Sequence, residues 1–181
     1  YNAKDGSLIM LNYKPSGLGQ LFAGFKNQIM RVNVKNGDVM WEQTYTGMVE
    51  RKVISRESTA HIDVKNGKVM IYLNGLQTYD YNTGAQLWNA AFDFTIDVIS
   101  KPHNAKRWGV YGAVADPLIV GNDVYVLDFK TPRKQYLKKY DLNSGKLLWT
   151  SPEIPDAKAI PGMYLVDNTV VLQMGGQVEC Q

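Results

Sequence analysis

The sequence is poor in the residues from which reactive sites are usually built. Its 181 residues include one cysteine and two histidines, His61 and His103. A single cysteine excludes an internal disulfide. Two histidines exclude a metal site with several histidine ligands and offer little to a histidine-dependent catalytic triad. The formal net charge of +3 is too small to indicate a nucleic-acid partner, and none is predicted.

Long apolar runs and helical periodicity are missing as well. No apolar run approaches the roughly 18 residues that a membrane-spanning helix needs, so no membrane span is predicted. No window of about 11 residues keeps the spacing of an amphipathic helix. Since 45% of the residues are hydrophobic, the chain can nevertheless bury a core. The sequence therefore predicts an all-β protein.

What the sequence does contain is a recurring phrase: Asp or Asn, a glycine four positions later, and a tryptophan four positions after the glycine. The clearest copies are 80–88 and 141–149, a third is 33–41, and a degenerate fourth is 2–10, with Met10 in place of tryptophan. Each copy predicts a β-hairpin, because Asp or Asn starts a turn and glycine supplies the positive φ that closes it. A phrase repeated at this spacing indicates a repeat architecture.

Strands around the phrase complete units of four. They are predicted at 59–64, 68–73, 76–80 and up to Trp88, and again at 117–120, 123–128, 135–141 and 146–150. Four-stranded antiparallel units in tandem predict a β-propeller. The predicted organisation is a half blade at 1–13, blades at about 14–46, 59–90 and 114–151, and a half blade at 160–181.

Two arrangements of the predicted half blades remain open. They could pair and close a ring of about four blades, or the chain is a segment of a larger propeller. The stretch between Met10 and Trp41 is short for four strands, so the first blade is expected to lack one. An open blade edge carries unpaired backbone groups, and self-association through such edges is therefore expected.

The phrase Asp-x-x-Thr-Gly-x-x-x-Trp at 80–88, with its relative at 141–149, resembles the repeat of the quinoprotein-type, or PQQ-like, β-propellers. The likeness extends over nearly the whole chain. It implies radial blades in which each tryptophan docks against the turn glycine of a neighbouring blade. It also implies a periplasmic, cell-surface or secreted location. The residues to which it assigns structural roles are Gly37, Trp41, Gly84, Trp88, Gly145 and Trp149.

The resemblance also raises the hypothesis of a PQQ-dependent dehydrogenase. Members with that activity need a catalytic aspartate, calcium-binding acidic and amide side chains, and commonly a pair of adjacent cysteines. This sequence lacks the cysteine pair, and Asp80 and Asp141 are explained by their turns. We therefore predict no catalytic residue, no metal site and no cofactor. PQQ and calcium enter only if the chain is a segment of such a dehydrogenase.

One connector departs from the needs of the repeat. Residues 91–113 form a link much longer than the usual 2–6 residues. In a propeller, this link and the loop at 129–134 emerge on the same face. Long loops on a rigid scaffold are typical binding elements, and Trp and Arg are enriched at binding hot spots. The candidate binding residues are Lys106, Arg107, Trp108, Lys130, Arg133 and Lys134.

This basic, aromatic rim has two interpretations. It is either a solvated charged face with Trp108 packed under its own loop, or a docking surface for an acidic protein partner or a glycan. The predicted function is a non-catalytic propeller scaffold for protein–protein interaction in the cell envelope. The alternatives are a segment of a PQQ-dependent dehydrogenase and a carbohydrate-binding propeller.

Overall fold

The computed structural model describes residues 3–12, 28–44, 61–72, 75–91, 115–131, 134–155, 160 and 162–173. Within these residues the regular structure is antiparallel β. The chain divides into two compact units, Tyr1–Arg56 with Ala60–Ala91, and Glu57–Thr59 with Phe92–Gln181. The two units are described separately below.

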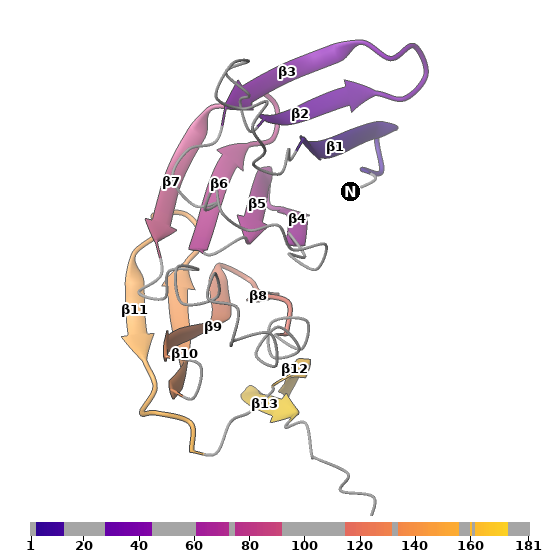
Figure 1. Ribbon diagram of the computed structural model, residues 1–181. Helices are drawn as coiled ribbons and strands as arrows, with labels where there is room; N and C mark the ends of the chain where they lie inside the picture. The colour runs from indigo at the N-terminus through magenta and orange to yellow at the C-terminus, as the bar shows by residue number, and fades with distance from the viewer. Residues whose placement is uncertain are drawn as a thin grey trace, which may run out of the picture. The chain divides into compact units, whose positions relative to one another are not determined.

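The first unit contains two sheets in which each strand pairs with its neighbour along the chain (Figure 1). The first sheet has three described strands, in the order β1 (Ser7–Asn12), β2 (Gln28–Asn33) and β3 (Val39–Thr44). The second sheet has four, in the order β4 (His61–Lys65), β5 (Lys68–Tyr72), β6 (Gly75–Asp80) and β7 (Gln86–Ala91).

The second unit repeats this pattern. Its third sheet follows the order β11 (Leu147–Thr150), β10 (Lys134–Asp141), β9 (Asp123–Thr131) and β8 (Leu118–Val120). A further pair consists of β12 (Gly162–Val166) and β13 (Thr169–Gln173). The prediction of an all-β chain built from four-stranded antiparallel sheets is confirmed.

The start of the chain corrects one prediction. β1 pairs with β2 in full register, from Ser7 opposite Asn33 to Asn12 opposite Gln28. The boundary expected between a half blade at 1–13 and a blade at 14–46 therefore falls inside a single sheet. Residues 1–13 supply β1, which belongs to the same sheet as β2 and β3. They are therefore not a separate half blade.

The phrase at 2–10 is also not a copy of the tryptophan phrase. The N–H of Val34 donates to the carbonyl of Gly6 at 3.2 Å, as the N–H of Tyr81 donates to that of Gly67 at 2.9 Å. Gly6 is therefore equivalent to Gly67, in the turn between the first and second strands of a sheet. The sequence misled because both hairpin turns of the repeat need a residue with positive φ. By the same equivalence, β1 and β13 both hold the position of a second strand.

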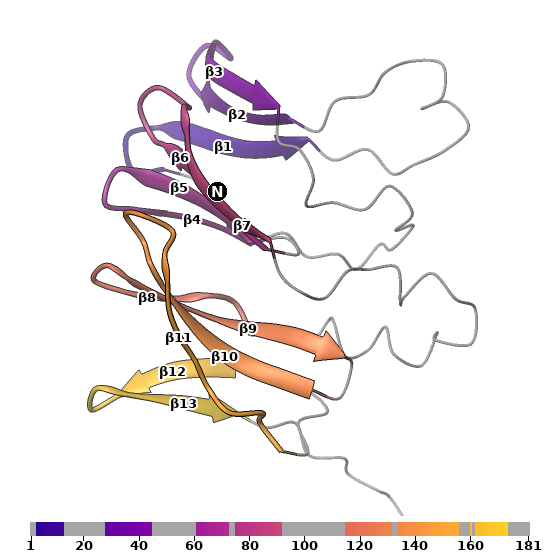
Figure 2. The same ribbon diagram turned by 90° about the vertical axis from the view of Figure 1, so that its left-hand side faces the viewer.

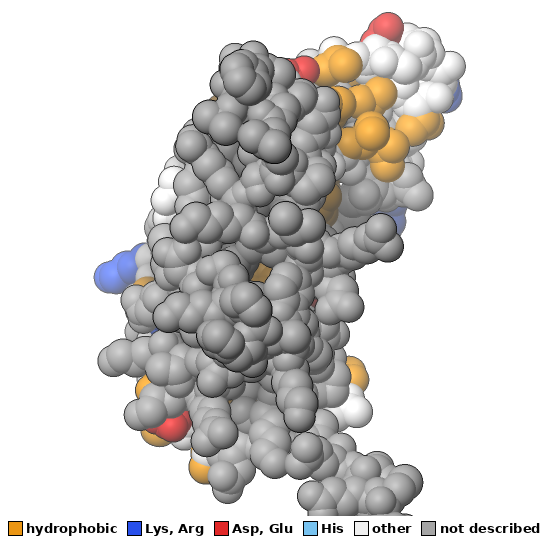
Figure 3. All heavy atoms as spheres, in the orientation of Figure 1, with side chains coloured by type: hydrophobic (Ala, Val, Ile, Leu, Met, Phe, Trp, Pro, Cys, Tyr) orange, Lys and Arg blue, Asp and Glu red, His pale blue; other side chains and the backbone are white. Residues whose placement is uncertain are grey.

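The first sheet leaves apolar side chains on its surface, where Figure 3 shows a group of hydrophobic atoms. Met10, Val34, Val39 and Met40 are between 44% and 57% exposed. A contiguous apolar patch on a protein surface commonly marks a contact with another sheet or another chain.

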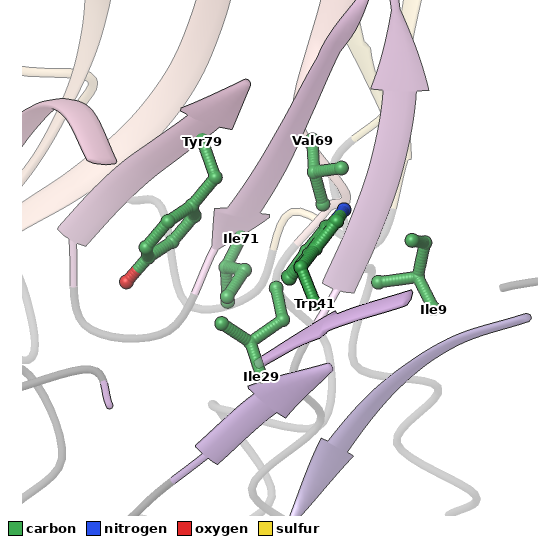
Figure 4. Packing of buried hydrophobic residues seen from close by; sticks show 6 residues of the cluster. All are labelled: Ile9, Ile29, Trp41, Val69, Ile71 and Tyr79. Atoms are coloured by element: carbon green, nitrogen blue, oxygen red, sulfur yellow. The ribbon is translucent and has the colours of Figure 1, made fainter. Parts of the chain in front are cut away.

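The core of the first unit lies between its two sheets (Figure 4). It contains Ile9, Ile29, Trp41, Val69, Ile71 and Tyr79, all buried. The indole of Trp41 lies against the backbone of Gly84, where an added Cβ would come within 2.6 Å of Trp41 Cδ2. The indole N–H donates to the carbonyl of Tyr81 at 2.8 Å. The ring thus buries its area and satisfies its one polar atom in the same contact.

A polar network joins the same two sheets beside the tryptophan. The guanidinium of Arg31 is paired with Asp5 at 2.6 Å and donates to the Ser7 hydroxyl and the Tyr81 carbonyl, each at 3.0 Å. Its Cζ also lies 3.8 Å from the centre of the Tyr81 ring. Because Arg31 is buried, these partners replace the water that its charge loses.

Hydrogen bonds from the Tyr81 hydroxyl and from Ser7 hold the pKa of the Asp5 carboxyl well below its ordinary value, and the charge of Arg31 adds to the effect. A lowered pKa means that the folded state binds the proton less readily than the unfolded chain does. Asp5 therefore contributes stability when it is ionised.

The core of the second unit lies between the third sheet and the β12–β13 pair. Buried residues Leu127 and Leu137 of the sheet pack with Ile160 and with Met163 of β12. Partly buried residues of β13, Val170 and Leu172, complete the contact. The pair therefore covers one face of the third sheet, as a following blade would.

Gly84→Ala is predicted to destabilise the protein more than Gly67→Ala. Both glycines lie in turns of the second sheet with φ of +72° and +70°, so both substitutions carry a similar backbone strain of about 1 kcal/mol. Only the Cβ at position 84 meets the indole of Trp41, which adds about 1–3 kcal/mol. Urea denaturation of the two variants measures the difference. Equal losses would show that the indole does not need the bare backbone.

The stability of the protein is predicted to fall in acid partly through Asp5. Its contribution is fully present above the ordinary Asp pKa of 3.8 and is lost as the pH falls toward the lowered folded-state value. Asp5→Asn should flatten this part of the dependence of the unfolding free energy on pH. Denaturation at a series of pH values measures it, with Asp38→Asn in an exposed turn as the matched control. An unchanged acid slope in Asp5→Asn would contradict the role of the network.

Candidate functional site

The two ends of each sheet differ. At one end, here called the turn end, short turns join the strands, including 66–67, 81–85, 121–122 and 142–146 (Figure 2). At the other, the connection end, the links from β1 to β2, β3 to β4 and β7 to β8 begin and finish. These links are far longer than a hairpin loop. Because binding residues concentrate on long loops held by rigid strands, the connection end is the candidate site.

Acidic residues at the turn end stabilise the turns themselves. One carboxylate oxygen of Asp80 accepts hydrogen bonds from the N–H and hydroxyl of Thr83, at 2.8 and 2.9 Å. Asp141 accepts the same pair of bonds from Ser144, both at 2.7 Å. The bonds from Thr83 lower the pKa of Asp80. Each carboxylate therefore stabilises its own turn, which confirms the turn role predicted for Asp80 and Asp141.

The tryptophans of the phrase differ in exposure. Trp41 is 7% exposed, Trp88 is partly buried, and Trp149 is 40% exposed. Gly37 has nothing within 4 Å of the position that a Cβ would take, whereas Gly84 is covered by Trp41. Among the positions described, the phrase gives a closed tryptophan–glycine contact at Trp41 and Gly84, whereas Gly37 is open and Trp149 is partly exposed.

In the third sheet, the β9–β10 hairpin forms part of the connection end. It is longer than the other hairpins and closes with Thr131 opposite Lys134. Lys130 is therefore near the end of β9, and Lys134 is the first residue of β10. β8 runs antiparallel to β9, and its first residue, Leu118, stands opposite Tyr125. The convergence of the two predicted loops stays a prediction, since their residues lie outside the described part of the chain.

The predicted contacts of these loops lie beyond the described part of the chain. Lys106, Arg107, Trp108 and Arg133 lie outside the described residues, and so do the side chains of Lys130 and Lys134. What the structure supplies is the scaffold that carries them.

Below the loops, the hairpin is anchored by an ion pair that sequence reasoning missed. Lys138 Nζ lies 2.5 Å from Asp128 Oδ2, and the two side chains are 12% and 2% exposed. Asp128 stands opposite Tyr136, so Lys138 is its diagonal neighbour on the same face. The sequence does show opposite charges on two adjacent predicted strands, which is the signal from which the ion pair could have been predicted. Only the strand register shows that they meet.

A second anchor ties the start of β10 to the chain that follows β11. The N–H of Ile154 donates to the carbonyl of Gln135 at 2.8 Å, and the N–H of Leu137 donates to the Ser151 hydroxyl at 3.0 Å. Gln135 itself is buried. The start of β10, next to the turn of the hairpin, is therefore bonded both to β9 and to the chain after β11, which suits a rigid support for binding loops.

Among the described residues, no group of three or more His, Cys, Asp or Glu side chains could hold a metal ion. In this part of the chain there is also no helix long and apolar enough to cross a membrane. The cofactor assignment made from the sequence stays a prediction.

Comparison with known proteins identifies relatives of the fold. A family model described as outer membrane protein assembly factor BamB matches residues 25–179. This match confirms the resemblance to PQQ-like propellers and the β-propeller fold. No curated protein matches the chain.

Three solved structures are similar over 81% of the chain. They are a europium-containing methanol dehydrogenase (TM-score 0.49, 17% identity), BamB from Moraxella catarrhalis (0.49, 16%) and the computationally designed Ika4 protein (0.48, 13%). The chain covers 23%, 37% and 73% of these proteins, respectively. It thus spans less than two fifths of the two natural ones.

Lys138→Met is predicted to destabilise the protein by about 3–5 kcal/mol, because it leaves the Asp128 carboxylate buried without its cation. The double variant Lys138→Met with Asp128→Leu should recover most of this loss, since it removes both charges. Urea denaturation of the two variants checks this. A double variant no more stable than the single one would show that the pair has another role.

Proposed function

The chain belongs to the family of the outer membrane protein assembly factor BamB, and from this premise we propose that it is a non-catalytic propeller scaffold for protein–protein interaction in the cell envelope. The observation that carries the proposal is the division of each sheet into a turn end and a connection end. The turn end uses its acidic and aromatic residues for packing. The connection end carries the long links and the predicted basic rim.

The chemistry of the turn end supports the non-catalytic part of the proposal. The carboxylates of Asp80 and Asp141 accept hydrogen bonds from their own turns. The indole of Trp41 packs against Gly84. A general base must reach a substrate proton, and these carboxylates are bound to backbone N–H groups instead. The Asp, Gly and Trp residues of the repeated phrase therefore have structural roles in turns and in packing between sheets.

The connection end of the third sheet supports the binding part. Its hairpin rests on the Asp128–Lys138 pair and on the Gln135–Ile154 bridge. The predicted residues carried there are Lys and Arg with one Trp, a set that favours a partner with an acidic surface. An envelope protein with such a surface is the proposed partner, with the site at Lys106, Arg107, Trp108, Lys130, Arg133 and Lys134.

A photo-cross-linking amino acid at position 108 or 133 tests this site in the intact cell envelope. Adducts with a defined protein are expected from both positions, and none from position 143 at the turn end of the same sheet. Lys130→Glu with Lys134→Glu should lower the adduct yield several-fold, whereas Lys146→Glu, an exposed turn-end residue, should not. Equal labelling from 108 and 143 would overturn the docking surface.

Titration with PQQ and calcium tests the non-catalytic assignment independently. No saturable binding is expected. Saturable binding together with dye-linked oxidation of an alcohol or a sugar would replace the scaffold with an enzyme.

A further inference from the structure

The β9–β10 hairpin of the third sheet (Figure 2) contains two pairing registers that meet at one point. Along most of its length the register is the one that places Leu127 opposite Leu137. The pair that closes the hairpin, Thr131 opposite Lys134, belongs to a register displaced by one residue, and the shift skips Lys130 on β9. One extra residue on one strand of an antiparallel pair is a β-bulge.

The register of the closing pair has a continuation without a bulge. Continued along both strands, it would place Asp128 opposite Leu137 and Leu127 opposite Lys138. Residues that stand opposite each other in an antiparallel pair put their side chains on the same face. A slip by one residue would therefore turn one of the two strands over, so that each of its side chains changes face. Two hairpins thus compete, one with the bulge and one without it.

Apolar side chains distinguish poorly between these two hairpins, because β9 is buried on both faces. Val124 and Val126 alternate with Leu127 along the strand, and all three are buried. If β9 turned over, apolar residues would replace apolar residues on either face. A strand with one apolar and one polar face specifies its register strongly, and β9 lacks that contrast at these positions. Another interaction must therefore hold the register.

The ion pair of Asp128 and Lys138 does distinguish between the two hairpins. Lys138 Nζ lies 2.5 Å from Asp128 Oδ2, and the side chains are 12% and 2% exposed. With Asp128 opposite Leu137, the Asp128 and Lys138 side chains would lie on opposite faces of the sheet. Breaking an ion pair in a buried place is strongly destabilising, because a charge is left there without its partner. The pair is therefore compatible only with the bulged hairpin.

We propose that the Asp128–Lys138 pair fixes the register of the β9–β10 hairpin and keeps the bulge at Lys130. A bulge bends its strand and redirects the residues beyond it, and bulges are common beside functional sites. The pair therefore sets how residues 130–134 are presented at the connection end. Where it concerns binding, this inference rests on the proposed docking surface, for which Asp128 and Lys138 are positioning residues that act through the hairpin.

Solution NMR of a variant without the two charges tests this role. Cross-strand Hα–Hα NOEs connect directly opposite residues. The original chain should show them for pairs of the present register, 127–137 or 128–136. Asp128→Leu with Lys138→Met makes burial compatible with both registers. It should add NOEs of the slipped register, 127–138 or 128–137, at roughly a tenth of the total intensity or more. A double variant that keeps only the present register would overturn the proposal.

The ion pair of Asp123 and Lys139 supplies the matched control. It joins the same two strands with the same diagonal spacing at 2.6 Å, but the side chains of Lys139 and Asp123 are 20% and 34% exposed. A more exposed pair contributes less, so Asp123→Leu with Lys139→Met should keep one register. Slipped-register NOEs of equal strength in this control would contradict the special role of the buried pair.

A second variant guards against loss of the fold. Far-UV circular dichroism shows whether Asp128→Leu with Lys138→Met is folded. If it is not, Asp128→Ala with Lys138→Met removes both charges with less added volume and is expected to give the same slipped-register NOEs. Their absence from this variant would count against the proposal in the same way.

Photo-cross-linking from position 133 extends the test to binding. Adducts from the Asp128→Leu, Lys138→Met variant should fall several-fold relative to the original chain, and those from the Asp123→Leu, Lys139→Met control should not. Undiminished adducts from a variant whose register slips would refute the positioning role. If the original chain forms no adducts, the proposed docking surface fails, and the NOEs alone decide whether the ion pair fixes the register.

Discussion

The structure of the first unit depends on one contact, the indole of Trp41 laid on the bare backbone at Gly84. It requires a large flat side chain on one sheet and, on the next, a residue with positive φ and no Cβ. The same contact gives the indole N–H a backbone acceptor at Tyr81. This one contact buries the apolar area of the indole, gives its N–H a hydrogen-bond acceptor and requires a glycine with positive φ. A short sequence phrase can therefore encode how a whole sheet packs.

Charged residues are added to this contact in a way that keeps them paired. Arg31 is buried against Asp5 and the face of Tyr81, and Lys138 is buried against Asp128. A buried charge without a partner costs far more than a pair contributes, so these residues make the packing specific as much as stable. They lie on strands whose neighbours are set by the repeat, and this fixes which charges can meet.

The two ends of the sheets have different roles, packing at the turn end and, as proposed, binding at the connection end. Turns of the repeat are tight, hydrogen-bonded and used in packing, and the long connections leave from the opposite end. A binding function proposed for the connection end therefore places no demand on the turns. The indole of Trp149, which is 40% exposed, and the open turn at Gly37 belong to this packing system and not to the connection end.

The sequence by itself determined the strands, the turns and the family, because Asp or Asn, Gly and Trp at a constant spacing are local signals for a hairpin. It could not assign 2–10, since a glycine turn before a strand looks alike in both hairpins of the repeat, and the pairing of β1 with β2 decided it. The Arg31 network and the Asp128–Lys138 pair also came only from the tertiary structure. Sequence spacing specifies which residues turn and which extend, but the partner of a buried charge depends on strand register and on the neighbouring sheet, which are long-range properties.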